Sequence, residues 1–296
     1  MFKELSSLTI VQRSWQGKVR DIYDLGDTLM IVTSDRISAF DFVFPTPIPD
    51  KGKILTKIST FFFRATQDMV PNHLISDRVE DLPKEFAPFH EYLADRFMLV
   101  KKTRVIPFEC IVRGYITGSA WSEYKRTNTI GGMLLPDSMQ ESQRFANPLF
   151  TPSTKAESGH DENISYREML QRMDQSLAEK IKDYSLEIFN YAHDRLWDEG
   201  IILADTKLEF GTIGSQVILI DEVLTPDSSR FWDASSYEIG RTPLSFDKQF
   251  LRDYLESINW GKQPPVPELP DEVVQKTREK YIHIYQVITK DTEYKW

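Results

Sequence analysis

Alternating apolar and polar positions predict that the chain begins with an antiparallel sheet. Residues 18–33 alternate in strand fashion on both sides of Gly26-Asp27. That dipeptide is a turn signal, so this segment is predicted to be a β-hairpin. The remaining elements expected in the first third are strands at 97–100 and 110–115, a proline-rich loop at 45–53 and a helix at 55–66.

Longer helical periods appear in the second half of the chain. Residues 136–164 are polar, contain three prolines and have no steady period, which predicts a long loop. Ser165 and Glu168 form a capping-box pattern, and the apolar residues that follow recur at helical spacing until Gly200. The elements expected after this single helix are strands at 201–209 and 217–222, joined by residues 210–215, and closing helices at 247–258 and 272–288.

The charge and cysteine content narrow the classes of partner and compartment. A formal net charge of −9 argues against nucleic acid and anionic membranes as partners, because both require a broad positive surface. A small anionic substrate would need lysines and arginines concentrated in one cleft. The single Cys110 excludes an intramolecular disulfide and a four-cysteine metal site, and no segment has the pattern of a signal peptide or membrane span. We therefore expect a cytoplasmic protein.

The segment LADTKLEFG, residues 203–211, concentrates charge on one face of a predicted strand. Because alternate side chains of a strand share a face, Asp205, Lys207 and Glu209 project together. Cross-strand charge pairs on a solvated edge would explain the same alternation. The apolar residues that precede the motif favour a buried strand.

The next predicted strand ends at Asp221. If the connecting loop holds an odd number of residues, Asp221 lies opposite Asp205 and close to Glu209. Sequence alone does not fix this register. Mg²⁺ prefers hard oxygen ligands and usually takes only one or two carboxylates beside phosphate. Glu209 and Asp221 are therefore the predicted metal ligands.

Two further segments have the residue types of anion sites. Gly17 precedes a strand that carries Lys18 and Arg20 on one face, and glycine lets the backbone approach a phosphate. A glycine–lysine pair that opens a hairpin is more often structural, and the chain contains neither a P-loop nor a GxGxxG fingerprint.

In the second segment, residues 105–119, Arg113 is able to bind phosphate or carboxylate, and Ser119 could complete an anion site. A strand pair between Arg113 and Glu109 is the alternative. Cys110 is expected to be an inert core residue.

Four motifs, taken in this order and spacing, closely resemble the SAICAR synthase family: GKVRDIY, IPFECIVRGYITGS, LADTKLEFG and DEVLTPDSSRFW, between Gly17 and about Leu255. The resemblance implies an α+β fold of two lobes, residues 1–103 and 104–296. An antiparallel N-terminal sheet would cover an ATP cleft as in protein kinases, and a second α/β lobe would carry the closing C-terminal helices. The long 136–164 segment resembles the longer branch of the family, which is typically monomeric.

The activity that the resemblance implies is ligation with ATP and Mg²⁺ as cofactors. The carboxylate of carboxyaminoimidazole ribonucleotide would be joined to the amine of L-aspartate through an acyl phosphate, giving SAICAR, ADP and phosphate in de novo purine biosynthesis. These small molecules would be the only substrates.

The resemblance also assigns roles to individual residues. Nucleotide contacts are implied for Gly17, Lys18, Arg20, one of Lys101 or Lys102, Glu209 and Asp221. Ribonucleotide contacts are implied for Arg113, Ser119, Asp205, Ser229, Arg230, Lys248 and Arg252. Catalytic roles fall to Lys207, Asp205 and Lys18. The segment with Ser153, Thr154, Lys155, His160 and Asp161 would close over the substrate or aspartate.

A small-molecule kinase and a nucleotide-binding module without chemistry are the competing interpretations. The kinase motifs HRDxxxxN and DFG are both missing, and His193-Asp194-Arg195 falls within a predicted helix. A kinase would release ADP without aspartate. A binding module would release no phosphate at all.

Overall fold

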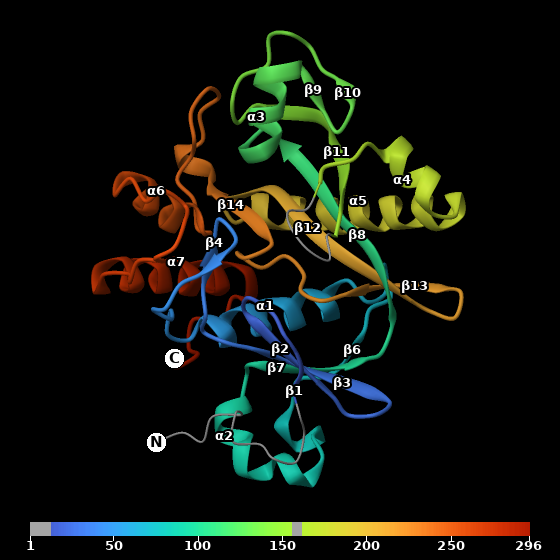
Figure 1. Cartoon of the computed structure of the whole chain (residues 1–296), viewed down its shortest axis with the longest axis vertical. Coiled ribbons are helices and arrows are strands. Elements are labelled where there is room, and N and C mark those ends of the chain that lie inside the picture. The colour runs from blue at the N-terminus through green and yellow to red at the C-terminus, as the bar shows by residue number, and fades with distance from the viewer. Residues whose placement is uncertain (1–12, 156–161) are drawn as a thin grey trace.

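Two antiparallel sheets form the framework of the protein (Figure 1). The computed structural model describes residues 13–155 and 162–296. The first sheet has the order β1-β2-β3-β7-β6, with strands at Arg13–Gln16, Arg20–Asp24, Thr28–Thr33, Phe97–Lys101 and Leu74–Ser76. The second has the order β11-β8-β12-β13, with strands at Arg144–Thr154, Arg104–Tyr115, Ile201–Ile213 and Gln216–Ile220, and β14 (Ser229–Asp233) also pairs with β12.

Helices and short hairpins complete the architecture. The helices are α1 (Lys51–Ala65), α2 (His90–Leu93), α3 (Gly118–Thr127), α4 (Tyr166–Arg172), α5 (Gln175–Trp197), α6 (Gln249–Ser257) and α7 (Asp271–Thr289). Two-residue strands pair as β4 (Ser38–Ala39) with β5 (Phe42–Val43) and as β9 (Thr129–Ile130) with β10 (Met133–Leu134). Short 3₁₀ helices lie at Val79–Asp81, Lys84–Phe89 and Ala234–Ser236.

The predicted first hairpin is confirmed. β2 and β3 pair antiparallel across the Gly26-Asp27 turn, where Gly26 has a φ of 93°. β7 lies where a strand was expected. β8 begins at Arg104, six residues before the predicted start, because pairing with β11 and β12 supports a longer strand. α1 likewise begins at Lys51 rather than at 55.

The prediction of an unstructured 136–164 segment is wrong in its centre. β11 pairs with β8, from Arg144 opposite Tyr115 to Thr154 opposite Phe108. It is the edge strand of its sheet, where prolines such as Pro148 and Pro152 are tolerated because one row of backbone groups needs no partner. The proline content hid a strand that only its pairing with β8 reveals.

The single helix predicted from Ser165 to Gly200 is two helices. The capping box is confirmed: the Glu168 amide donates to Ser165 Oγ at 3.2 Å, and the Ser165 amide donates to Glu168 Oε2 at 2.7 Å. However, α4 ends at Arg172, and Asp174 then caps α5 by accepting a hydrogen bond from the Leu177 amide at 3.1 Å. Asp174 therefore marks the start of a separate second helix. The closing helices α6 and α7 lie where they were expected.

The odd-length connection that would place Asp221 opposite Asp205 is not formed. β12 and β13 are joined by the two residues 214–215, so Glu209 lies opposite Ile220 and Asp221 is not opposite Asp205. β13 ends at Ile220, and Asp221 has a φ of 66°. This left-handed conformation turns the chain out of the strand and redirects the Asp221 side chain.

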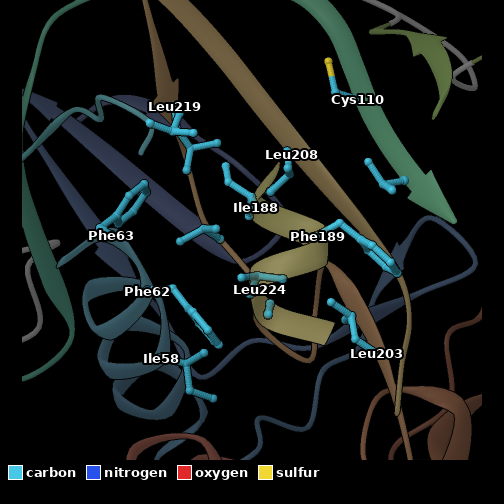
Figure 2. Packing of buried hydrophobic residues seen from close by; sticks show 14 of the residues in the cluster. Ile58, Phe62, Phe63, Cys110, Ile188, Phe189, Leu203, Leu208, Leu219 and Leu224 are labelled. Carbon is cyan, nitrogen blue, oxygen red and sulfur yellow. The ribbon is translucent and has the colours of Figure 1, made fainter. Parts of the chain in front are cut away.

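One hydrophobic core joins the two sheets (Figure 2). α1 contributes Ile58, Phe62 and Phe63 to it, packs on β3 and β7 and contacts α7. α5 covers β8 and β12 from the other side, and Cys110 is wholly buried there, which confirms it as a core residue. Burial raises the pKa of the Cys110 thiol, so it stays protonated and unreactive.

The division into lobes 1–103 and 104–296 stays a prediction. It falls between β7 and β8.

Across residues 13–155 and 162–296, no helix is long and apolar enough to cross a membrane.

The packing of α5 on β8 predicts the effect of one substitution. A Cβ atom added at Gly114 would lie 2.7 Å from Phe189 Cζ. Gly114→Ala should therefore lower the free energy of unfolding by about 1–3 kcal/mol, as overpacking of a core does. Urea unfolding measures this. Gly261→Ala is the matched control, because an added Cβ there meets nothing within 4 Å. An equal effect of both substitutions would contradict the packing argument.

Candidate active site

A cavity of about 660 Å³ lies between the two sheets. Its apolar lining residues are Val19, Ile22, Leu29, Ile31, Val100, Val105 and Ile220, and most of them come from the first sheet. Its charged lining residues include Glu109, Lys207, Glu209 and Asp221 of the second sheet and the loop that follows it. The volume suits a small-molecule ligand with one flat apolar part and one highly charged part.

The charged face of β12 is confirmed. Lys207 and Glu209 line this cavity, and Asp205 and Lys207 line a second, smaller one beside it. Leu208 and Phe210 point the other way and are wholly buried. β12 lies inside its sheet, paired with β8, β13 and β14, so the alternative of a solvated edge is wrong.

Each acid of the larger cavity is held by a cation. Glu109 lies directly opposite Glu209 on β8, an arrangement of like charges that is unfavourable without neutralisation. The Lys207 ammonium contacts Glu109, and Lys155 Nζ donates to Glu209 Oε2 at 2.5 Å. Burial lowers the pKa of Lys207, but Glu109, Glu209 and Glu222 together outweigh this and raise it, so the lysine stays charged.

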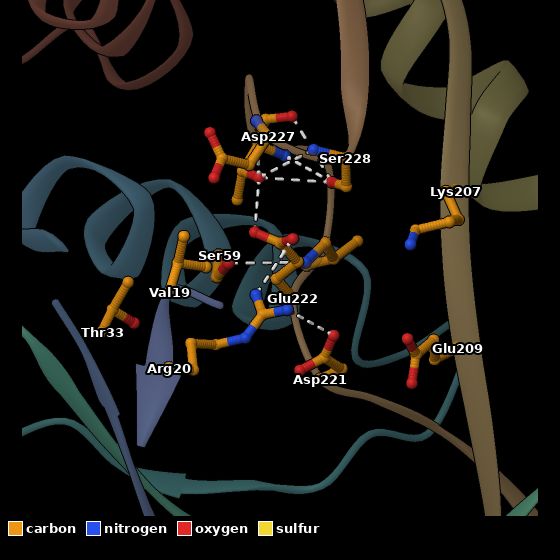
Figure 3. Close-up of polar contacts among 12 residues, drawn as sticks. Val19, Arg20, Thr33, Ser59, Lys207, Glu209, Asp221, Glu222, Asp227 and Ser228 are labelled. Atoms are coloured by element: carbon orange, nitrogen blue, oxygen red, sulfur yellow. Dashed lines mark hydrogen bonds and ion pairs between the residues drawn. The ribbon is translucent and has the colours of Figure 1, made fainter. Parts of the chain in front are cut away.

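Arg20 connects the first sheet to the loop after β13 (Figure 3). Its guanidinium lies 2.8 Å from Asp221 Oδ2 and 3.0 Å from Glu222 Oε1. Burial and the nearby Glu209 raise the pKa of Asp221, although Arg20 opposes the shift. The buried guanidinium therefore holds an acid that lies far from it in the chain.

Glu209 and Asp221 are suited to a divalent cation. Both line the larger cavity and interact electrostatically, so the turn at Asp221 brings it near Glu209 although the two are not paired across the strands. No group of three or more histidine, cysteine or acidic ligands occurs within the described ranges. Two carboxylates are the donor set that Mg²⁺ takes when water and phosphate complete its shell.

Lys18 and Arg20, the two cations that follow Gly17, lie in different surroundings. Lys18 and Arg20 both line the larger cavity, but Lys18 is half exposed and contacts Asp41. The Gly17 amide donates to the Arg20 carbonyl at 2.7 Å. The ring of Trp15 lies so close to Gly17 that an added Cβ would be 2.5 Å from it, so a larger residue here would displace this exposed ring.

Of the two candidate lysines at the end of β7, Lys101 and Lys102, only Lys101 lines the larger cavity. Lys101 lines it, and its ammonium donates to the Asn72 carbonyl at 3.5 Å. Lys102 instead contacts Asp24 at 2.6 Å and is not part of the lining. The geometry favours Lys101.

The smaller cavity, of about 260 Å³, is rich in cations. Five line it, against three carboxylates: Arg113, Lys207, Arg230, Lys248 and Arg252 against Asp205, Asp227 and Asp247. In a chain whose net charge is −9, this local excess makes an anion-binding pocket.

Asp205 organises the arginines of the smaller cavity. It contacts Arg230 and lies 3.4 Å from the Arg113 guanidinium. Arg113 also donates to Thr151 Oγ1 at 2.9 Å and lies 3.5 Å from Ser119 Oγ. The alternative pairing of Arg113 with Glu109 is not formed. Ser229, the remaining predicted contact, also lines this cavity, and its hydroxyl lies 2.8 Å from Thr206 Oγ1.

The two cavities share a wall made by Lys207, Asp227, Lys248 and Arg252. A group bound in one cavity is therefore close to a group bound in the other.

The predicted closing segment is only partly described. Lys155 lines the larger cavity, and Ser153 Oγ donates to Glu109 Oε2 at 3.2 Å. The Thr154 hydroxyl accepts from the Glu162 amide at 3.3 Å. His160 and Asp161 lie outside the described residues.

Sequence reasoning missed three residues of the site and gave Glu109 no role. Glu222 accepts from Arg20, His73 lines the larger cavity, and Lys51 is buried against the shared wall. Burial lowers the pKa of His73 to about 3, so it is neutral. No sequence signal marked Lys51, because the predicted helix began at residue 55 and placed Lys51 in the preceding loop.

Known proteins match both the sequence and the fold. The family model for SAICAR synthetase matches residues 13–267. A phosphoribosylaminoimidazole-succinocarboxamide synthase from Geobacter sulfurreducens is 55% identical over 268 residues, 90% of each chain. Another from Trichlorobacter lovleyi is 54% identical, over 94% of this chain and 93% of its own. SAICAR synthase from Saccharomyces cerevisiae, solved in complex with SAICAR, superposes with a TM-score of 0.90 and 40% identity, covering 100% of this chain and 99% of its own.

The fold, the paired cavities and these matches define an ATP-dependent ligase. The chain belongs to the SAICAR synthetase family. Its reaction is the ATP-dependent ligation of carboxyaminoimidazole ribonucleotide with L-aspartate in purine biosynthesis. The kinase and binding-module interpretations are set aside on this ground.

Proposed function

We propose that the larger cavity binds Mg²⁺–ATP, that the smaller one binds the ribonucleotide, and that the reaction takes place at their shared wall beside Lys207. The observation that carries this proposal is the pair of adjoining cavities with Lys207 in the lining of both. The γ-phosphate of one ligand and the carboxylate of the other would meet there. Such positioning of two reactants accounts for much of the rate gained by ligases of this kind.

The charges of the larger cavity support a nucleotide bound with a metal ion. Its apolar wall suits a purine base, and its lining holds seven cations against six acids: Lys18, Arg20, Lys101, Lys155, Lys207, Lys248 and Arg252 against Asp41, Glu109, Glu209, Asp221, Glu222 and Asp227. A triphosphate brings about four negative charges, which this near balance does not neutralise. Glu209 and Asp221 would hold Mg²⁺, which supplies the missing charge and stabilises the transferring phosphoryl group.

The smaller cavity supports the binding of a phosphate monoester. Asp205 fixes Arg113 and Arg230, so both guanidinium groups are ordered before a ligand arrives. Planar guanidinium groups bind phosphate or carboxylate through paired hydrogen bonds. Lys248 and Arg252 extend the positive surface toward the larger cavity.

The chemistry follows from the inertness of a carboxylate toward amines. An oxygen of the ribonucleotide carboxylate attacks the γ-phosphorus of ATP, ADP leaves, and an acyl phosphate forms. The aspartate amine then adds to the acyl carbon, loses a proton, and expels phosphate to leave an amide. Lys18, Arg20 and Lys207 spread the negative charge of the transferring group, so no side-chain nucleophile is needed.

We also propose that the chain acts as a monomer in the cytoplasm. Lys155, which lines the larger cavity, would lie close to the bound ribonucleotide or aspartate.

An omission assay tests the overall function. Purified protein is incubated with ATP, Mg²⁺, carboxyaminoimidazole ribonucleotide and L-aspartate, and ADP, phosphate and the amide product are measured while each component is left out in turn. The full mixture should give the three products in equal amounts. A stable phosphorylated ribonucleotide that forms in equal yield without aspartate would support a kinase instead. The absence of any phosphate release would leave only nucleotide binding.

The metal assignment predicts the behaviour of Asp221→Asn. Loss of a ligand charge should reduce Mg²⁺-dependent kcat/KM by roughly 10²-fold or more, more than the loss of an outer-shell partner does. The measurement is a Mg²⁺ titration of turnover, with circular dichroism as the check of folding. Asp183→Asn, an exposed substitution on α5, is the matched control. Full activity of Asp221→Asn would place the cation elsewhere.

The ribonucleotide assignment predicts a selective effect of Arg230→Ala. Its KM for the ribonucleotide should rise at least about tenfold through loss of a charge-assisted hydrogen bond, and its KM for Mg²⁺–ATP should change by less than about threefold. Arg241→Ala, which removes an exposed arginine paired only with Glu238, should change neither constant. Equal losses of affinity for both ligands would remove Arg230 from this role.

A further inference from the structure

Lys51 is a charged residue in a place that local physics disfavours. It is the first residue of α1, where the helix dipole repels a cation, and its side chain is 0% exposed. A buried ammonium is costly unless it is paired. Its Nζ lies 2.8 Å from Asp227 Oδ2, so the first lobe places a fully desolvated charge against a residue of the shared wall.

The backbone around Lys51 is fixed on both sides. Asp50 receives two hydrogen bonds from Arg278 of α7, at 2.8 and 2.6 Å. The Gly52 amide donates to Asp35 Oδ1 at 2.8 Å, and a Cβ at Gly52 would lie 2.3 Å from the Thr33 carbonyl oxygen. Lys51 therefore has little freedom to move away from its partner.

Asp227 is shared between two lysines. Lys248 Nζ lies 2.9 Å from the same oxygen that Lys51 contacts, and the Tyr281 hydroxyl donates to Oδ1 at 2.7 Å. Burial alone would raise the pKa of Asp227, but Lys248 and Lys51 outweigh it and hold that pKa well below its usual range. One carboxylate thus faces two ammonium groups, and the cluster has one positive charge in excess.

That excess charge faces the ligands. Lys51 lies behind the wall and lines neither of the two cavities, whereas Lys248 and Asp227 line both. Were Lys51 absent, Asp227 would pair with Lys248 alone, and the wall would become neutral at this point. With Lys51 present, Asp227 is already satisfied from behind, so the charge of Lys248 remains available to an anion.

We propose that Lys51 is a positioning residue that holds Asp227 from the first lobe, so that Lys248 presents its charge to the phosphate of the ribonucleotide. This inference rests on the proposed placement of that ligand in the smaller cavity. It makes α1 part of the binding machinery although no atom of Lys51 reaches the ligand.

Lys51→Met tests the proposal, because methionine fills a similar volume without the charge and Asp227 keeps Lys248 as its partner. The KM for the ribonucleotide should rise at least about tenfold, as expected for one charge lost at a partly desolvated site. The KM for Mg²⁺–ATP should change by less than about threefold. Lys57→Met is the matched control: it lies on the same helix, pairs with Asp95 and lines neither of the two cavities. An unchanged KM for the ribonucleotide in Lys51→Met would overturn the proposal.

The double variant Lys51→Met/Asp227→Asn separates charge from packing. It removes one charge of each sign, so Lys248 again carries a positive charge that no carboxylate shares. It also removes the buried carboxylate that loses a partner in Lys51→Met, so it serves as the test if that single variant does not fold. Its KM for the ribonucleotide should lie below that of Lys51→Met and within about tenfold of the wild-type value, because Lys248 regains an unshared charge although Asp227 no longer orients it. A larger loss in the double variant would mean that Lys51 acts only through packing. If the wild-type protein shows no aspartate-dependent product, the proposed function fails, and this inference fails with it for a separate reason.

Discussion

The structure depends on ion pairs through which β2 and α1 hold the loop between β13 and β14. Arg20 holds Asp221 and Glu222, and Lys51 holds Asp227. The Val223 amide adds a contact to Ser59 Oγ of α1 at 3.4 Å. Each of these pairs is largely desolvated, so losing one partner would leave a buried charge uncompensated. These pairs hold the loop against β2 and α1, and residues of this loop line both cavities.

The same pairs explain how an acidic protein binds two anionic substrates. Asp205 pairs with Arg113 and Arg230 in the wall of the smaller cavity, and Asp227 is shared between Lys51 and Lys248. The lining of the smaller cavity holds five cations against three carboxylates. The lining of the larger one is nearly balanced, with seven cations against six acids. Three of these cations, Lys207, Lys248 and Arg252, line both cavities.

Much of the site could be predicted because it lies on short, regular segments. The period of a strand placed Asp205, Lys207 and Glu209 on one face without knowledge of the fold, and the apolar residues around them predicted burial. The predictions failed where contacts with residues distant in the chain decide the local structure. Pairing with β8 made a strand of 144–154, and a positive φ rather than register brought Asp221 to Glu209. Lys51 lies 176 residues from its partner, a separation that no local pattern spans.

The sequence by itself determined most of the elements, the charged face of β12 and, through four long motifs, the family. These depend on side-chain periodicity and on residue types that are read along the chain. Only the tertiary structure decided which cation pairs with which acid, that Lys101 and not Lys102 faces the cavity, and that the two cavities share a wall. Coulomb interactions act through space and grow as water is excluded, so their partners are set by the packing that buries them.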